Sequence, residues 1–195
     1  MKNWIFISAL SASCLLSACG GSGSSNGSGT GTDPETKVDG FTITPLPNSD
    51  LQKAVKMGIN GFPAEEGILK DGKRNGTWVV FHDGSNQPAM MASYVDNRYN
   101  GLYLEFDRNN QITLRAFYQN NLLDGYWARY SFGQKGIETT YKNGKLDGVY
   151  KEFRANGSIA KEMHYKDGQL DGPYKFYDDM GNVILEYEYR NGKKI

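Results

Sequence analysis

Cysteine is scarce in this 195-residue chain, which has only two, and both lie within the first 19 residues. No disulfide can therefore tie together the long region that follows, whose fold must be held by hydrogen bonds and side-chain packing. Sustained helical periodicity is also missing from residues 67–195. Short segments rich in aromatic and β-branched residues take its place, so we expect an all-β fold.

Catalytic and metal-binding patterns are lacking as well. The two histidines, His82 and His164, have no second ligand at the spacing typical of zinc sites. No Gly-x-Ser-x-Gly turn opens a helix in residues 38–195. The sequence therefore predicts a protein that is not an enzyme, with no catalytic residues, no metal and no cofactor.

Charge is balanced and dispersed, with 22 Lys and Arg residues against 22 Asp and Glu residues. Aromatic residues make up 13% of the chain and could stack on bases, but no basic stripe accompanies them. Binding to a phosphate backbone depends on such a stripe. We therefore expect no nucleic-acid partner.

What the chain has is a repeat of about 24 residues. The first residue of each unit is Leu69, Tyr94, Tyr118, Tyr141, Tyr165 or Tyr189. Seven residues later, five of the units carry a glycine: Gly76, Gly101, Gly125, Gly148 and Gly172. A period of this size predicts a stacked array in which each unit buries its apolar face against its neighbours.

Each unit has the turn chemistry of a β-hairpin. Pairs such as Asn143-Gly144 and Asp167-Gly168 tolerate the positive φ angles that tight hairpin turns require. Val183, Leu185, Tyr187 and Tyr189 would share one face of a strand, with Glu186 and Glu188 on the other, as in a strand with one buried face. Asn97-Arg98 and Asn120-Asn121 depart from the Asn-Gly pair, which predicts a different turn type at these two places.

Two aromatic residues, three positions apart, follow each repeat glycine. The first aromatic row is Trp78, Tyr103, Trp127, Tyr150 and Tyr174, and the second aromatic row is Phe81, Phe106, Tyr130, Phe153 and Tyr177. A regular strand places the two rows on opposite faces, whereas a bulge would return them to one face. These ten residues are the candidate binding surface, and the alternative is that most of them pack across strands.

An acidic or amide residue precedes each repeat glycine. Asp124, Asp147 and Asp171 could form a row of carboxylates for a cation such as calcium. Asn75 and Asn100 occupy the same position in earlier units, which favours a role in a turn or bulge.

The complete pattern is Tyr-x-(Asn/Asp)-Gly-x-x-(Asp/Asn)-Gly-x-(Tyr/Trp)-x-x-(Phe/Tyr), and it is clearest over residues 141–172. It resembles the MORN-repeat variant of bacterial proteins grouped as the YwqK-family antitoxins, over about two thirds of the chain. The resemblance implies an elongated, single-layer antiparallel sheet of repeated hairpins without catalytic residues. It also implies a role in neutralising a toxin.

Residues 1–18 have the features of a leader peptide. Lys2 provides the positive charge, and Trp4–Leu16 is an apolar core too short to span a bilayer as a permanent helix. The next residues, up to Cys19, resemble the lipobox of bacterial lipoproteins, which implies cleavage before Cys19 and attachment of lipid there. The alternative is an ordinary secretory signal cleaved near Ala18. By the same resemblance, the absence of Asp after the cysteine implies an outer-membrane location.

The remaining segments are assigned by composition. Residues 19–37 form a lipidated cysteine with a flexible Gly/Ser linker, and residues 67–195 hold about five repeat units and a partial one. Residues 38–66 do not fit the repeat and predict a small irregular N-terminal cap. Within the cap, Phe41–Thr44 alternates like a strand, and Asp50–Met57 predicts a short helix.

These features together predict a non-enzymatic lipoprotein of the cell envelope. Its repeat sheet is expected to bind a protein partner, with neutralisation of an envelope-acting toxin or effector as the most specific version. The alternative is a structural lipoprotein that serves as an envelope scaffold or associates with glycan or peptidoglycan.

Overall fold

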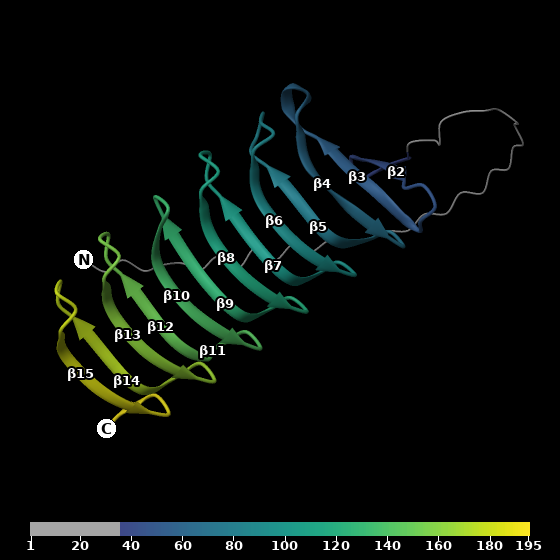
Figure 1. Cartoon of the computed structure of the whole chain (residues 1–195). Helices are drawn as coiled ribbons and strands as arrows, with labels where there is room; N and C mark the ends of the chain where they lie inside the picture. The colour runs from purple at the N-terminus through teal and green to yellow at the C-terminus, as the bar shows by residue number, and fades with distance from the viewer. Residues whose placement is uncertain (1–35) are drawn as a thin grey trace, which may run out of the picture. The chain divides into compact units, whose positions relative to one another are not determined.

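One antiparallel β-sheet accounts for the part of the chain that the computed structural model describes, residues 36–195. The predicted leader, Cys19 and most of the linker lie outside the described residues. Figure 1 shows the strands following one another as hairpins laid side by side. The expected all-β, single-layer sheet of repeated hairpins is confirmed. Across residues 36–195 there is no helix long and apolar enough to cross a membrane.

Strand order in the sheet follows the chain, except that the short β11 pairs with β10 beside β12. Within residues 36–195, one 3-10 turn, η1 (Ile59–Gly61), interrupts the strands. The strands are β1 Thr36–Val38, β2 Phe41–Pro45, β3 Leu51–Met57, β4 Pro63–Lys70, β5 Lys73–Phe81, β6 Pro88–Val95, β7 Arg98–Phe106, β8 Ile112–Gln119, β9 Leu122–Ser131, β10 Gln134–Lys142, β11 Lys145–Leu146, β12 Gly148–Phe153, β13 Ile159–Lys166, β14 Gln169–Tyr177, β15 Val183–Arg190 and β16 Lys193–Lys194.

The helix expected over residues 50–57 is wrong, because this segment is strand β3. β3 is paired on both sides, with Ala54 opposite Ile43 of β2 and Gly67 of β4. These cross-strand pairs outweigh the weak helical spacing of three apolar residues. Most of the segment expected as an irregular cap is therefore regular sheet that continues the array.

Tight two-residue turns line one edge of the sheet, which we call the turn edge (Figure 1). Both residues of each turn have positive φ, and the pairs are Asp71-Gly72, Asp96-Asn97, Asn120-Asn121, Asn143-Gly144, Asp167-Gly168 and Asn191-Gly192. The prediction of a different turn type in two units is wrong. Asn97 and Asn121 adopt the left-handed conformation that glycine has elsewhere, which asparagine tolerates better than most residues.

Hydrogen bonds at the turn edge join each hairpin to the one before it. The second turn residue donates its backbone N–H to a carbonyl of the preceding hairpin: Asn97 to Arg74, Asn121 to Tyr99, Gly144 to Leu123, Gly168 to Leu146 and Gly192 to Leu170. Asn97 and Asn121 add a second bond, because their Oδ1 atoms accept the backbone N–H of Arg74 and Tyr99 at 2.7 Å. The asparagine side chains thus couple units in which glycine is missing.

The residue before the repeat glycine has a backbone role. Asp124 Oδ2 accepts the backbone N–H of Asn143 at 2.9 Å, and Asp147 Oδ2 accepts that of Asp167 at 3.2 Å. The strand register is irregular around this position, and Gly148 has a φ of +122°. A Cβ on Gly148 would lie 2.2 Å from Thr140 Oγ1, so the position requires glycine for space as well as for conformation. The turn or bulge interpretation is confirmed for Asp124 and Asp147.

Candidate binding surface

The first aromatic row lies within a continuous row of side chains across the sheet, on a face that we call the packed face. The register carries this row through Trp78, Ala92, Tyr103, Ala116, Trp127, Thr139, Tyr150, Met163, Tyr174 and Tyr187. Each hairpin supplies a large ring from its first strand. In four hairpins the second strand supplies a smaller or unbranched residue. Each of the central rings therefore lies between two less bulky side chains of the neighbouring strands. The side chains of the row pack against one another without a second layer of secondary structure.

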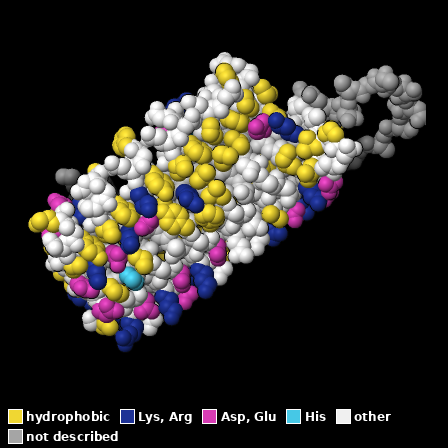
Figure 2. All heavy atoms as spheres, viewed as in Figure 1, with side chains coloured by type: hydrophobic (Ala, Val, Ile, Leu, Met, Phe, Trp, Pro, Cys, Tyr) yellow, Lys and Arg dark blue, Asp and Glu magenta, His cyan; other side chains and the backbone are white. Residues whose placement is uncertain are grey.

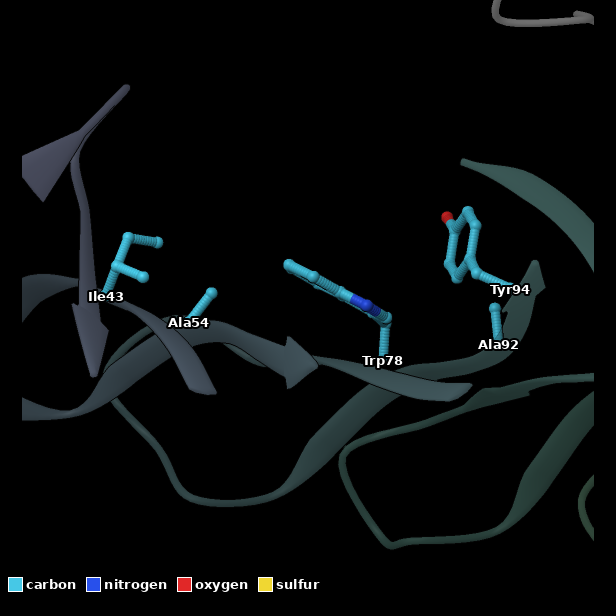
Figure 3. Close-up of a cluster of buried hydrophobic side chains, with 5 residues drawn as sticks. All are labelled: Ile43, Ala54, Trp78, Ala92 and Tyr94. Atoms are coloured by element: carbon cyan, nitrogen blue, oxygen red, sulfur yellow. The ribbon is translucent and has the colours of Figure 1, made fainter. Parts of the chain in front are cut away.

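Trp78 is the most completely buried large side chain of the described residues, with 1% of its surface exposed. Its indole Nε1–H donates to the Ile68 carbonyl at 3.0 Å. Gly67 leaves the space that the indole needs, because a Cβ there would lie 2.2 Å from Trp78 Cδ2. Figure 3 shows Ile43, Ala54, Trp78, Ala92 and Tyr94 on the same side of their strands.

The opening tyrosines of the units extend the packed face toward the turn edge. All five of them lie opposite a repeat glycine. The first-row rings contact them at centroid distances of 5.6–6.4 Å: Trp78 with Tyr94, Tyr103 with Tyr118, Trp127 with Tyr141, Tyr150 with Tyr165 and Tyr174 with Tyr189. Most of these contacts are edge-to-face or tilted, geometries that aromatic pairs prefer. Burial raises the pKa of Tyr94 and Tyr103 above the ordinary value, and it raises the pKa of Tyr150 to about 12.

The second aromatic row lies on the opposite face, which we call the open face. Between Trp78 and Phe81 the strand runs without an inserted residue, and the extra residue, Ala89, is on the partner strand β6. The same register shift recurs in the four following units, at Thr113, Gly136, Ala160 and Ile184. Of the two alternatives that the spacing leaves open, the placement on opposite faces is therefore confirmed.

The open face changes character along the array. From strand β5 onward, its central cross-strand row runs through the apolar residues Val79, Met91 and Leu104 and then through Arg115, Ala128, Glu138, Lys151, Glu162, Lys175 and Glu186. On the N-terminal side, Val79 lies opposite Glu66 of β4. In the second half, acidic and basic residues alternate strand by strand. Figure 2 shows a face on which hydrophobic side chains gather over the middle of the sheet, with mixed charges toward the C-terminal hairpins.

Ion pairs hold the charged half of this row. Lys151 Nζ lies 3.8 Å from Glu162 Oε2, and Lys175 Nζ lies 3.3 Å from Glu186 Oε1. Lys135, at the border between the two halves, donates to Glu138 at 2.6 Å and lies over the Phe153 ring, 5.5 Å from its centroid. These three lysines therefore each have a local acidic partner.

The apolar half has no covering element among residues 36–195. A shallow hollow there is lined mainly by Thr77, Met91, Ser93, Leu102 and Leu104. A second hollow, in the charged half, is lined by Tyr126, Glu138, Thr139, Thr140, Val149 and Lys151. Within the described residues no three side chains of His, Cys, Asp or Glu converge in a way that could hold a metal ion.

Sequence spacing groups the ten aromatics as one candidate surface, and the structure separates them into two rows. The first row is largely packed within its own face, while the second row borders the open face. Met91, Leu102 and Leu104 were missed as candidates. The available signal was a short apolar run in each strand, residues 88–92 in β6 and residues 102–104 in β7, because a strand segment with two apolar faces loses its alternation.

The fold defines a protein built from repeated β-hairpins in a single sheet. Two of its segments, residues 146–167 and 170–191, match the family model described as MORN repeat variant. The chain thus carries MORN-type repeats, as the pattern of Gly and aromatic residues predicts.

Other comparisons give distant likenesses. No curated protein matches the chain. Among solved structures, the GtfA/B complex matches at 13% identity and a TM-score of 0.26, over 79% of this chain and 21% of that chain. A mutant of S. aureus TarM in complex with Fondaparinux, alpha-GlcNAc-glycerol and UDP matches at 12% identity and a TM-score of 0.30, over 68% of this chain and 21% of that chain. TarM itself matches at 12% identity and a TM-score of 0.30, over 67% and 22%. The chain spans about a fifth of the length of these structures.

Proposed function

We propose that this chain is a non-enzymatic, lipid-anchored protein of the bacterial cell envelope that binds a protein partner through its open face. The observation that carries the proposal is the apolar half of this face, where Val79, Met91 and Leu104 lie side by side across strands. A contiguous apolar surface bordered by charged residues is typical of the centre and rim of a protein interface. The most specific version of the partner is an envelope-acting toxin or effector, which the resemblance to the antitoxin group supports.

The binding test uses the chain from residue 20 onward to capture partners from the envelope and secretions of its own organism. Leu104→Lys places a charge in the apolar half, whereas Val149→Lys makes the same change on the charged half of the same face. We expect Leu104→Lys to lose a stoichiometric protein that the unsubstituted chain and Val149→Lys both recover. Circular dichroism checks that both variants keep the sheet.

Two results would count against binding through the open face. Equal recovery by both variants would place the interface elsewhere. Recovery of peptidoglycan or abundant envelope components, with no stoichiometric protein, would favour the alternative of an envelope scaffold that associates with glycan.

The anchor has its own test, since Cys19 precedes the described residues. Cys19→Ser removes the thiol to which lipid would be attached, and we expect this variant to leave the membrane fraction while its repeat sheet stays folded. Cys14→Ser is the matched control, because Cys14 falls within the predicted leader, and it should change neither property. A Cys19→Ser chain that stays with the membrane at unchanged electrophoretic mobility would contradict the lipoprotein interpretation.

A further inference from the structure

One two-residue turn has a different residue type from the other two-residue turns of the sheet, which begin with Asn or Asp. Strands β9 and β10 are joined by two residues, Phe132 and Gly133, with φ angles of +50° and +73°. Among residues 36–195, thirteen non-glycine residues have positive φ; twelve are Asn or Asp, and the other is Phe132. Left-handed backbone is unfavourable for a bulky side chain, so local conformation does not explain a phenylalanine at this position.

Packing does not explain it either. Phe132 is 95% exposed, more than any other large hydrophobic residue of the described chain. Phe132 lies at the edge of the sheet opposite the turn edge, which we call the loop edge. The other repeat hairpins end there in loops of five or six residues, and among them only this hairpin ends in a two-residue turn. Strain that no internal contact offsets is a reason to look for an external one.

The neighbouring loops make the ring an isolated projection. The preceding loop, 107–111, is polar, and Asp107 Oδ1 accepts the backbone N–H groups of Asn109 and Gln111 within it. The following loop is held by Arg154, whose guanidinium donates to the Ile159 carbonyl at 2.6 Å and lies 3.0 Å from Asp179. A bilayer surface would have to accept these polar loops together with the ring. A concave pocket in a protein can accept the ring alone.

The ring also adjoins the open face. Tyr130, two residues before it, belongs to the second aromatic row, and Lys135, three residues after it, lies over the Phe153 ring. We propose that Phe132 is an anchor of the interface, inserting its ring into an apolar pocket of the protein partner at the loop edge of the open face. This inference rests on the proposed function and adds the residue that fixes the partner's position. Aromatic anchors seated in pockets carry much of the binding energy of protein interfaces.

The first experiment separates folding from binding with Phe132→Asn. This variant has an Asn-Gly tip, the pair that already closes the turn at 143–144. We expect its melting temperature to equal or exceed that of the unsubstituted chain. A clear decrease would show that Phe132 has a structural role and would overturn the proposal. Met180→Asn is the matched control, because Met180 is 86% exposed on another loop of the same edge.

The second experiment probes contact directly with the full-length chain produced in its own organism. The photoreactive residue p-benzoylphenylalanine is placed at position 132 or, as a control, at position 180. We expect the residue at position 132 to crosslink to one protein, the same protein that the unsubstituted chain captures and the Leu104→Lys variant loses. We expect the residue at position 180 to give no adduct. In a competition assay, free chain is added to displace this protein from immobilised unsubstituted chain. We expect the Phe132→Asn chain to be needed at a concentration at least about tenfold higher than the unsubstituted chain for the same displacement.

The other outcomes are distinguishable. Suppose that a protein is captured by the unsubstituted chain and lost with Leu104→Lys, but that position 132 gives no adduct. That result would contradict the role of Phe132 as an anchor and would still support the proposed function. Adducts with lipid alone would also contradict that role, in favour of a membrane contact. Failure of both capture and crosslinking would remove the proposed function and the anchor together.

Discussion

Five repeat units each place a first-row aromatic on the packed face and a second-row aromatic on the open face, yet the two faces differ in what surrounds these rings. On the packed face, rings alternate with less bulky residues, and Ala92 and Ala116 are almost fully buried. On the open face, the central row passes from apolar to charged residues within one array. The packed face must keep a large ring beside a less bulky residue from unit to unit. The open face is under no such constraint and can diverge toward a partner.

The largest difference between the faces should appear on removing the Trp78 ring. Trp78→Ala is expected to lower the free energy of unfolding by about 3–5 kcal/mol, because it removes the largest fully buried side chain of the described residues. Val79→Ala, on the adjacent residue of the open face, should cost no more than about 1 kcal/mol. Urea denaturation followed by circular dichroism measures both.

A double-mutant cycle sharpens the same comparison. Gly67→Ala alone should cost about 1–3 kcal/mol, since its Cβ would overlap the Trp78 ring. In the Trp78→Ala background the same substitution should cost close to nothing, because the ring is gone. Additive costs in the two backgrounds would mean that Gly67 is needed for a reason other than Trp78.

A smaller effect is expected from alkaline pH, which should lower the free energy of unfolding through the buried tyrosines of the packed face. Burial raises the pKa of Tyr150 to about 12 in the folded chain, whereas an unfolded tyrosine titrates near 10. The neutral hydroxyl is therefore favoured by folding, and its contribution is complete below pH 10. It is lost as the pH rises from 10 through about 12, because the unfolded chain releases its proton first.

Tyr150→Phe tests this linkage. It keeps the ring but removes the titrating hydroxyl, so the fall in urea midpoint between pH 10 and 12 should be shallower than for the unsubstituted chain. An identical pH dependence would assign the alkaline loss to other groups, such as Tyr94 and Tyr103, whose pKa values burial also raises.

The smallest effect is expected on the charged half of the open face. Glu162 lies opposite Lys151 and Lys175, and its carboxylate is also 3.3 Å from the His164 ring. Glu162→Gln should lower the free energy of unfolding by less than about 1 kcal/mol, because partly exposed ion pairs contribute little. Glu162→Lys should cost more, since it sets three lysines in adjacent strands.

Measurements at low and high salt concentration distinguish a loss of charge pairing from a loss of packing. The cost of Glu162→Lys should shrink in concentrated salt, which screens the repulsion between lysines, whereas the cost of Trp78→Ala should not. A Glu162→Lys penalty that is unchanged by salt would indicate lost packing instead of lost charge pairing.

Sequence spacing was sufficient for the repeat, the hairpins and the roles of residues such as Asp147, because these depend on local conformation. It failed at Leu51–Met57, where pairing with β2 and β4 decides the structure and the short apolar pattern fits a helix as well. It also misassigned the turn at Asp96-Asn97, because asparagine there adopts the conformation expected of glycine.

The candidate surface was only partly predictable for a different reason. Spacing finds the ten aromatics, but which face each row occupies depends on where the inserted residue lies, and this is a property of the paired strand. Phe132 gives no signal in the repeat pattern, because it stands at a tip where the pattern has no fixed residue. Its significance appears only when its backbone conformation and its exposure are known together.

The hydrogen bonds that join successive hairpins at the turn edge have a consequence for how such arrays evolve. Every unit is two strands, and every unit meets the next through the same kind of bond, as Gly144 does with Leu123. Duplication or deletion of one whole unit would change the width of the array by about 9–10 Å and leave each remaining side chain on its face. Gene-level gain and loss of units could therefore fit the length of this protein to partners of different size without redesigning either face.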